Sequence, residues 1–330
     1  MTPVAASGAG GRTGEAIETV AVVGAGAMGG LYASFFARAG MPVSLVARGA
    51  RAERLAGQGI TVNGEPLRAR VVDADSLAAA PPAPADLVLV AVKHHELDAA
   101  LDDVAPLVGP DTTVLSVLNG LDSEERIAAR FGPGSVLLCI ALAMDAMRDG
   151  TAVTFRQPGR LVLGEADNTT PSPRVLAVQR ALDRAGLAWS TPVDMRHEMW
   201  WKFMVNVGIN QASAVLRAPY GAFVAPGDAR SLMLALIDEV VAVAAAEGVV
   251  LGPDDLARWD AVLAAQPADG RTSMHQDVEA GRPTEVDIFA GRVLALGEQH
   301  GLPTPVNQVM LWVLRSLAPS PAGTPSGATS

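Results

Sequence analysis

A short apolar run, a glycine-rich turn and an amphipathic segment follow one another near the start of the chain. Residues 19–23 (TVAVV) are apolar or β-branched, GAGAMGG comes next, and LYASFFARAG then has apolar residues at helical spacing as far as Gly40. A second apolar run, PVSLVA at 42–47, completes a strand–turn–helix–strand unit. Such a unit requires a mostly parallel sheet covered by helices, so the chain is predicted to begin with an α/β domain of the Rossmann type.

The glycines of this turn have the G-x-G-x-x-G spacing of dinucleotide-binding sites. In that motif the first glycine permits the tight turn, the second lets the backbone approach a pyrophosphate, and the third lets the helix pack close to the strand. The helix N-terminus offers free N–H donors to the phosphates. The sequence therefore predicts a dinucleotide site at Gly24, Gly26, Ala27, Met28 and Gly29.

The end of the second strand predicts which dinucleotide binds. An NAD site usually has an acidic residue there, to bind the ribose hydroxyls. Here the strand ends in Ala47 and Arg48, with Arg51 close behind, and the first acidic residue is Glu53. Because a guanidinium pairs well with phosphate oxygens, Arg48 favours NADPH over NADH as the cofactor. An arginine exposed to solvent at a strand end is the alternative.

Two further apolar runs end in polar residues. DLVLVAV (86–92) is followed by Lys93, and TTVLSVL (112–118) is followed by Asn119. Both runs are typical of buried parallel strands, whose carboxyl ends form the ligand-binding edge of an open sheet. Taken singly, Lys93 could simply extend into solvent, and Asn119 with Gly120 could simply form a turn.

The remaining pattern predicts two domains. A hairpin is expected to turn at Asn63-Gly64, more short strands are expected over 136–168, and the pattern beyond Ser172 is helical. We therefore expect a disordered leader over 1–17 and an NADP-binding domain over 18–170. An all-helical domain is expected over 171–317 and a disordered tail over 318–330.

Composition excludes several classes of protein. The net charge of -10 disfavours a nucleic-acid partner or an acidic membrane surface. The single cysteine, Cys139, fits a reducing compartment, and no uncharged apolar run is long enough to span a bilayer. A soluble, cytoplasmic protein is expected, either a monomer or a homodimer. His94, His95 and His197 lack the companions of a metal-ligand pattern, so no metal is expected.

The segment WWKFMVNVGIN, residues 200–210, is apolar except for three polar residues spaced four apart. Lys202, Asn206 and Asn210 would lie along one helix face as a stripe about 12 Å long, at 1.5 Å per residue. Burying an unpaired amide costs about 1–3 kcal/mol, and an ammonium costs far more, so such residues need partners. The stripe is either a narrow solvent face or the wall of a polar cleft that faces a ligand.

With these motifs, the chain resembles the 2-dehydropantoate 2-reductase (ketopantoate reductase) family over residues 19–317. The resemblance rests on GAGAMGG with Arg48 downstream, VK at 92–93, NG at 119–120, the spaced lysine and asparagines, and SMHQDVEAGRPTEVD at 273–287. It implies NADPH-dependent reduction of a 2-keto acid to a 2-hydroxy acid, most closely 2-dehydropantoate to (R)-pantoate in pantothenate (coenzyme A) biosynthesis. The expected partner is thus a small keto acid.

The same resemblance implies roles for individual residues. Lys202 matches the general acid that polarises the keto oxygen and protonates the alkoxide, and Glu285 matches the acid that holds this lysine and the substrate hydroxyl. For Glu285 the alternative is an ordinary glutamate in a helix first turn, with Thr284 as the N-cap. Substrate-binding groups are implied at Asn206, Asn210, Ser273 and Asn119, and groups that contact the cofactor at Lys93 and Asn119.

The chain also departs from the family pattern. Residues 140–144 are the apolar Ile-Ala-Leu-Ala-Met, Phe155 stands where a histidine is expected, and Glu96 where a glutamine is usual. These changes would make the wall of the substrate pocket more apolar. Two alternatives therefore stay open: a paralogous reductase of another bulky keto acid, and a non-catalytic NADPH-binding sensor. The lysine–glutamate pair argues against the sensor, which needs no proton donor.

Overall fold

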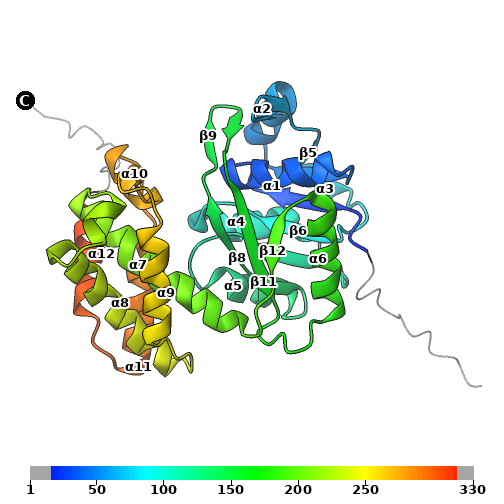
Figure 1. The fold of residues 1–330 in the computed structure, drawn as a ribbon. Helices are drawn as coiled ribbons and strands as arrows, with labels where there is room; N and C mark the ends of the chain where they lie inside the picture. The colour runs from blue at the N-terminus through cyan, green and yellow to red at the C-terminus, as the bar shows by residue number, and fades with distance from the viewer. Residues whose placement is uncertain (1–15, 318–330) are drawn as a thin grey trace, which may run out of the picture. The chain divides into compact units, whose positions relative to one another are not determined.

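The computed structural model describes residues 16–317, and the chain divides into two compact units between Arg196 and His197 (Figure 1). Each unit is described separately below. The expected tail over 318–330 and residues 1–15 of the expected leader lie outside the described residues. Ile17, which the leader was expected to include, is only 6% exposed and belongs to the core of the first unit.

The first unit is built on an eight-stranded sheet in the order β12-β11-β8-β7-β6-β1-β2-β5. Neighbouring strands pair in parallel except β8 and β11, which are antiparallel. The strands are β1 (Val20–Val23), β2 (Val43–Ala47), β5 (Arg70–Asp73), β6 (Leu87–Val90), β7 (Thr113–Ser116), β8 (Val136–Met144), β11 (Pro158–Gly164) and β12 (Ala188–Ser190).

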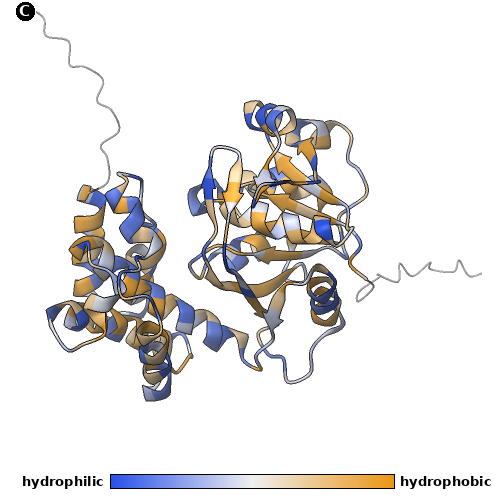
Figure 2. Ribbon diagram, turned by 45° about the horizontal axis from the view of Figure 1, so that its top comes forward, coloured by the Kyte–Doolittle hydropathy of each residue, from blue (hydrophilic) through white to orange (hydrophobic). Residues whose placement is uncertain are grey.

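Both faces of this sheet are covered, which explains why its strands are apolar throughout. Alternate residues of β1 point to opposite faces: Val20 and Val22 join one core, and Ala21 and Val23 the other. Figure 2 shows the strands as mainly hydrophobic ribbon. The first core includes residues of α1 (Ala27–Arg38), α2 (Ala50–Gln58) and α6 (Pro173–Ala185). The second core includes residues of α3 (Ala74–Ala79), α4 (Leu97–Val104) and α5 (Ser123–Phe131). Two short 3-10 helices also belong to this unit: η1 (His94–Glu96) and η2 (Ala105–Leu107).

A second, four-stranded sheet with the order β4-β3-β10-β9 packs beside α1. Its strands are β3 (Thr61–Val62), β4 (Glu65–Pro66), β9 (Met147–Asp149) and β10 (Ala152–Thr154). The hairpin predicted at Asn63-Gly64 is confirmed, with φ of +50° and +85° at the two turn residues, as a two-residue hairpin turn requires.

The first unit extends beyond the boundary expected at residue 170. Helix α6 buries Val175, Val178 and Leu182 in the core beside α1, and β12 adds to the sheet edge by parallel pairing with β11. The helical pattern after Ser172 thus begins inside the first unit, with α6. The amphipathic pattern of a helix predicts which of its faces is buried, but it does not predict which element covers that face.

The second unit is helical, which confirms the expected fold class: an α/β unit followed by an all-α one. Within the part of the chain that the structure describes, no helix is both long and apolar enough to cross a membrane. The elements are α7 (Met195–Leu216), η3 (Tyr220–Phe223), α8 (Asp228–Ala246), α9 (Pro253–Ala264), α10 (Ser273–Glu279), the π-helical η4 (Asp287–Gly291), α11 (Arg292–His300) and α12 (Pro305–Leu317).

Helix α7 is fixed to α8 and α12 by close packing and by buried hydrogen bonds. A Cβ at Gly208 would lie 2.7 Å from Ile237 Cγ1, so glycine lets α7 and α8 approach closely. Gln211 Nε2 donates to Asn307 Oδ1 at 3.0 Å, and Asn307 Nδ2 donates to Glu239 Oε2 at 2.7 Å. Since buried polar groups require partners, this chain of bonds sets the register of the three helices.

In the first unit, α1 begins directly against the turn that leaves β1. A Cβ at Gly29 would stand 1.9 Å from the carbonyl oxygen of Gly24, so no side chain fits there. At Gly26 the nearest heavy atom to such a Cβ is Ala91 O at 4.0 Å, an ordinary contact. The two glycines thus differ: packing requires Gly29, while Gly26 faces space that the described residues leave open.

This difference generates a prediction for stability. Gly29→Ala should lower the free energy of unfolding by about 3 kcal/mol, because the backbone carbonyl of Gly24 must move to admit the methyl group. Gly26→Ala should change the free energy of unfolding by less than about 0.5 kcal/mol, since its methyl group would make only an ordinary contact with Ala91 O. Urea unfolding followed by circular dichroism measures both. Equal stability of the two variants would contradict the packing role of Gly29.

Candidate functional site

The glycine turn lies at the point where the strand order reverses. Strand β1 pairs with β2 on one side and with β6 on the other, so ligands of such a sheet bind outside the carboxyl ends of β1 and β6. Gly24 has φ of +96°, and a Cβ there would be 2.4 Å from Ala91 O, directly after β6. The turn therefore closes against the end of β6, and Gly26 is the N-cap of α1.

The N-terminus of α1 fits the phosphates of a dinucleotide. The first N–H groups of a helix, here those of Ala27 and Met28, have no intrahelical acceptor. A Cβ at Gly26 would have only Ala91 O as a neighbour, at 4.0 Å, so the protein leaves room for a ligand atom there. A cradle of this shape suits the pyrophosphate of a nicotinamide dinucleotide.

Arg48 lies at the end of β2, where it forms ion pairs with two aspartates. Its Nε donates to Asp103 Oδ1 at 2.7 Å, its Nη2 lies 2.6 Å from the same oxygen, and its Nη1 pairs with Asp75. The hydrogen bond to Asp103 and the charge of that carboxylate raise the pKa of Arg48. The side chain remains 51% exposed, so an added phosphate could still reach it. Asp75 of α3 and Asp103 of α4 are remote from Arg48 in the chain, so no local sequence pattern predicts these pairs.

Lys93 and Asn119 follow neighbouring parallel strands at the same level. Val90 of β6 pairs with Ser116 of β7, and Lys93 and Asn119 each stand three positions further on. Lys93 is exposed, Asn119 is partly buried, and the Lys93 N–H donates to Glu96 Oε2 at 3.3 Å. Both residues are thus at the edge of the sheet that holds the glycine turn, as expected.

A buried hydrogen-bonded chain lies beside Asn119. Ser116 Oγ donates to Ser123 Oγ at 2.9 Å, Ser123 Oγ donates to Glu124 Oε2 at 2.7 Å, and Leu118 N–H donates to Ser116 Oγ at 3.3 Å. Burial raises the pKa of Glu124 to about 7, although the bond from Ser123 opposes this shift. This chain fixes the backbone that leads into Asn119.

His94 takes part in an ion-pair cluster rather than in a metal site. Its Nε2 lies 2.7 Å from Asp122 Oδ2, and Arg126 of α5 lies 3.2 Å from the same nitrogen. Burial alone would raise the pKa of Asp122, but the hydrogen bond and charge of His94 outweigh it and lower the pKa. Among residues 16–317 no group of three or more His, Cys, Asp or Glu side chains could hold a metal ion.

In the second unit, α7 carries the predicted polar stripe. Trp200, Trp201 and Phe203 beside it are buried, whereas Lys202 and Asn206 are partly buried and Asn210 is 7% exposed. The first half of the helix is anchored to α9, because Trp201 Nε1 donates to Asp255 O at 3.1 Å and the Arg258 guanidinium lies 3.7 Å from the Trp201 ring centroid. The stripe is therefore held on a rigid helix.

The two asparagine amides of the stripe differ from the other buried amides of α7. Gln211, one residue beyond the stripe, is bonded to Asn307 and to the Val207 carbonyl. The side-chain amides of Asn206 and Asn210 make no hydrogen bond to any residue of the described chain. Because buried polar groups are nearly always satisfied, these amides point to water or to a polar ligand. The stripe thus carries two amides that water or a polar ligand can reach.

Ser273 and Glu285 belong to the same unit as the stripe. Ser273 is the exposed first residue of α10, whose N-cap Thr272 accepts from the His275 N–H at 3.1 Å and bonds Ser213 Oγ of α7 at 2.7 Å. Glu285 is partly buried and directly precedes Val286, the N-cap of the π-helical η4. The N-cap expected at Thr284 is thus two residues away from the observed one.

The apolar residues that depart from the family pattern lie mainly in the core. Ile140 and Ala141 are buried in β8, and the Phe155 ring packs against Phe35 of α1 with centroids 5.9 Å apart. Ile140, Ala141 and Phe155 thus pack in or against the interior of the first unit. Leu142 and Met144 are only partly buried, and Ala143 is exposed.

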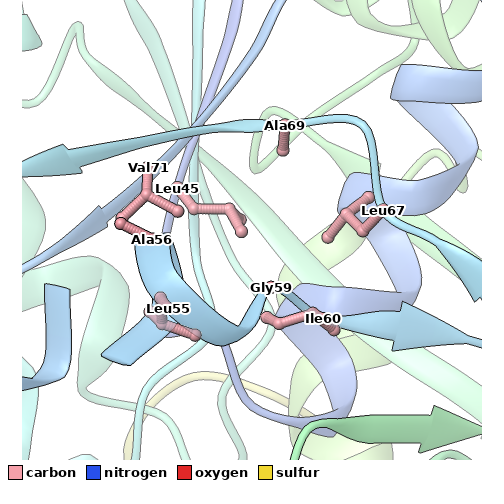
Figure 3. A pocket seen from close by; sticks show the side chains of 8 residues that line it. All are labelled: Leu45, Leu55, Ala56, Gly59, Ile60, Leu67, Ala69 and Val71. Carbon is pink, nitrogen blue, oxygen red and sulfur yellow. The ribbon is translucent and has the colours of Figure 1, made fainter. Parts of the chain in front are cut away.

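A hollow of about 250 Å³ lies beside α2, away from the strand ends. Figure 3 shows that side chains of α2, β2 and β5, and of the segment between α2 and β5, surround this hollow. Its lining offers no charged or hydrogen-bonding side chain; it consists of Leu45, Leu55, Ala56, Gly59, Ile60, Leu67, Ala69 and Val71. The candidate residues therefore lie elsewhere: at the glycine turn and sheet edge within the first unit, and on the α7 stripe within the second.

Comparisons with known proteins show the family of this chain. Residues 20–168 match the family described as ketopantoate reductase PanE/ApbA, and residues 194–318 match its C-terminal family. A 2-dehydropantoate 2-reductase from Mesorhizobium japonicum is 31% identical over 91% of this chain and 97% of its own length.

Solved structures show the same fold. A 2-dehydropantoate 2-reductase from Geobacter metallireducens has a TM-score of 0.76 at 28% identity and covers 90% of this chain and 99% of its own. A D-mandelate dehydrogenase with NADH and anilino(oxo)acetate has a TM-score of 0.80 at 22% identity and covers 91% and 97%. The chain belongs to the ketopantoate reductase PanE/ApbA family and is an NAD(P)-dependent keto-acid reductase of that family.

Proposed function

We propose that this protein reduces 2-dehydropantoate to (R)-pantoate with NADPH, a step of pantothenate and coenzyme A biosynthesis. The observation that carries the proposal is the α7 stripe, in which Lys202 stands on one helix face with Asn206 and Asn210, whose side-chain amides make no hydrogen bond to the described residues. The Mesorhizobium japonicum relative that is named for this reaction supports the choice of substrate.

Each residue of the second unit has a chemical role in this proposal. The ammonium of Lys202 donates a hydrogen bond to the keto oxygen and then protonates the alkoxide that forms. Glu285 holds Lys202 in position and accepts a hydrogen bond from the substrate hydroxyl. Asn206, Asn210 and Ser273 bind the remaining oxygens of the substrate, which satisfies the two asparagine amides.

The residues of the first unit bind and orient the cofactor. NADPH, when bound, supplies the hydride that reduces the keto carbon. Gly24, Gly26 and Gly29 shape the turn for its pyrophosphate, and Arg48 pairs with the 2′-phosphate. Lys93 and Asn119 contact cofactor and substrate from the ends of β6 and β7.

A larger apolar 2-keto acid is the second candidate substrate. At the end of β8, Leu142 and Met144 are partly buried and Ala143 is exposed with φ of +58°, so this strand end keeps apolar atoms at the surface. A D-mandelate dehydrogenase shares the fold and binds the aromatic keto-acid analogue anilino(oxo)acetate.

Removing the proton donor should slow the reaction without weakening cofactor binding. Lys202→Ala is expected to lower kcat by about 10²–10⁴, the usual effect of losing a positioned general acid. The NADPH dissociation constant should remain that of the wild type, because the glycine turn belongs to the other unit. Lys202→Arg keeps the charge but is a far weaker acid, so it should restore substrate binding more than rate. Stopped-flow NADPH oxidation measures these rates, and wild-type turnover by Lys202→Ala would exclude the role.

The substrate hydroxyl provides a matched test of specificity. A site that bonds this hydroxyl should prefer 2-dehydropantoate over 3,3-dimethyl-2-oxobutanoate, the same keto acid without the hydroxyl, by about 10²-fold or more in kcat/KM. Phenylglyoxylate serves as the bulky aromatic competitor. The highest kcat/KM on phenylglyoxylate would favour the second candidate and remove 2-dehydropantoate as the substrate.

Cofactor preference depends on Arg48 in this proposal. Arg48→Ala should raise the NADPH KM at least several-fold and leave the NADH KM nearly unchanged, because only the 2′-phosphate contact is lost. Asp103→Asn serves as a control, since it keeps Arg48 but removes the carboxylate that competes with phosphate. It should lower the NADPH KM. A wild type that prefers NADH would contradict the role of Arg48.

A further inference from the structure

The β9–β10 hairpin is held against α1, beside the glycine turn. Arg148 of β9 is paired with Val153 of β10, and Val153 is fully buried, with Cγ2 3.0 Å from the Cβ position of Gly30 in α1. Side chains of residues that pair across two strands lie on the same face of the sheet. Arg148 therefore extends on the face that meets α1.

The guanidinium of Arg148 reaches the glycine turn itself. Its Nη1 donates to the carbonyl oxygen of Ala25, between Gly24 and Gly26, and its Nε donates to the Gly150 carbonyl at 2.9 Å. Arg148 is nonetheless exposed. These two bonds leave the donors of Nη2 without an acceptor among the described residues, so they are available to a ligand.

No carboxylate of the described chain pairs with Arg148. The charge that acts on it is another cation, Arg51 in the first turn of α2. Partial burial of the Arg148 guanidinium, together with this repulsion, lowers the pKa of Arg148. Arg51 has a single long ion pair, 3.5 Å from Glu96 Oε1. Like charges that act on each other repel, and an anion bound by both guanidiniums would relieve that repulsion.

We propose that Arg148 binds a phosphate group of the nicotinamide dinucleotide. The proposal rests on the cofactor assignment made above and adds a cation from a hairpin remote in sequence from the glycine turn. Arg148 donates one hydrogen bond to the Ala25 carbonyl of the turn. Its remaining N–H donors, together with those of Arg51, bind phosphate oxygens. The phosphate is either the pyrophosphate, which NADH and NADPH share, or the 2′-phosphate of NADPH.

Dissociation constants for NADPH and NADH, measured by fluorescence titration without any keto acid, test this role. Arg148→Gln should weaken NADPH binding about tenfold or more, whereas Arg156→Gln, which removes one exposed positive charge just after β10, should change it less than about twofold. Equal weakening of NADH and NADPH assigns the pyrophosphate, and weakening of NADPH alone assigns the 2′-phosphate. Titration with ADP and with 2′,5′-ADP checks this distinction.

Thermal unfolding of each variant separates binding from folding. If Arg148→Gln unfolds, Arg148→Lys keeps the charge and should bind NADPH between the wild type and the loss expected for glutamine. Wild-type affinity for both dinucleotides in Arg148→Gln overturns the proposal. A wild type that binds neither dinucleotide overturns the cofactor assignment itself. Because these titrations contain no keto acid, a wrong choice of substrate in the kinetic assays would not change either binding result.

Discussion

The organisation of the first unit depends on the contact between Gly29 and the carbonyl of Gly24. Because no side chain separates them, α1 starts directly at the carboxyl end of β1, and its free N–H groups lie at the point where the strand order reverses. Every other residue assigned to the cofactor is placed relative to that turn. Arg48, Lys93 and Asn119 end the neighbouring strands, and Arg148 reaches the turn from the second sheet.

In the second unit, the corresponding constraint is that the polar groups of the buried helix α7 need hydrogen-bond partners. Helix α7 is buried enough to need partners for every polar group, and it is anchored to α9, α8 and α12 by Trp201, Gly208 and Gln211. On its packed faces the Gln211 amide nitrogen and the Trp201 indole nitrogen both donate hydrogen bonds to neighbouring groups. The side-chain amides of Asn206 and Asn210 make no such bond within the described chain. This contrast within one helix is what a surface that binds a polar ligand would show.

Sequence patterns predicted what depends on neighbours in the chain. The glycine turn, the hairpin at Asn63-Gly64 and the strand ends at Lys93 and Asn119 follow from local spacing and hydrophobic periodicity, and the structure has them where expected. Contacts between distant segments left no such pattern. The acids beside Arg48, the Arg148 bond to Ala25, the packing of Phe155 on Phe35 and the place of α6 in the first unit all depend on tertiary structure.

The short strand β12 limits how this protein can be divided. It covers the edge of β11, whose residues Leu161 to Leu163 are buried, and Trp189 ties it to α6 through a bond to Asp183 at 2.7 Å. A fragment that stopped at residue 170 would leave a long, apolar strand edge with unpaired N–H and C=O groups. Such an edge recruits strands from other molecules, so an isolated nucleotide-binding half would aggregate unless it kept the chain through β12.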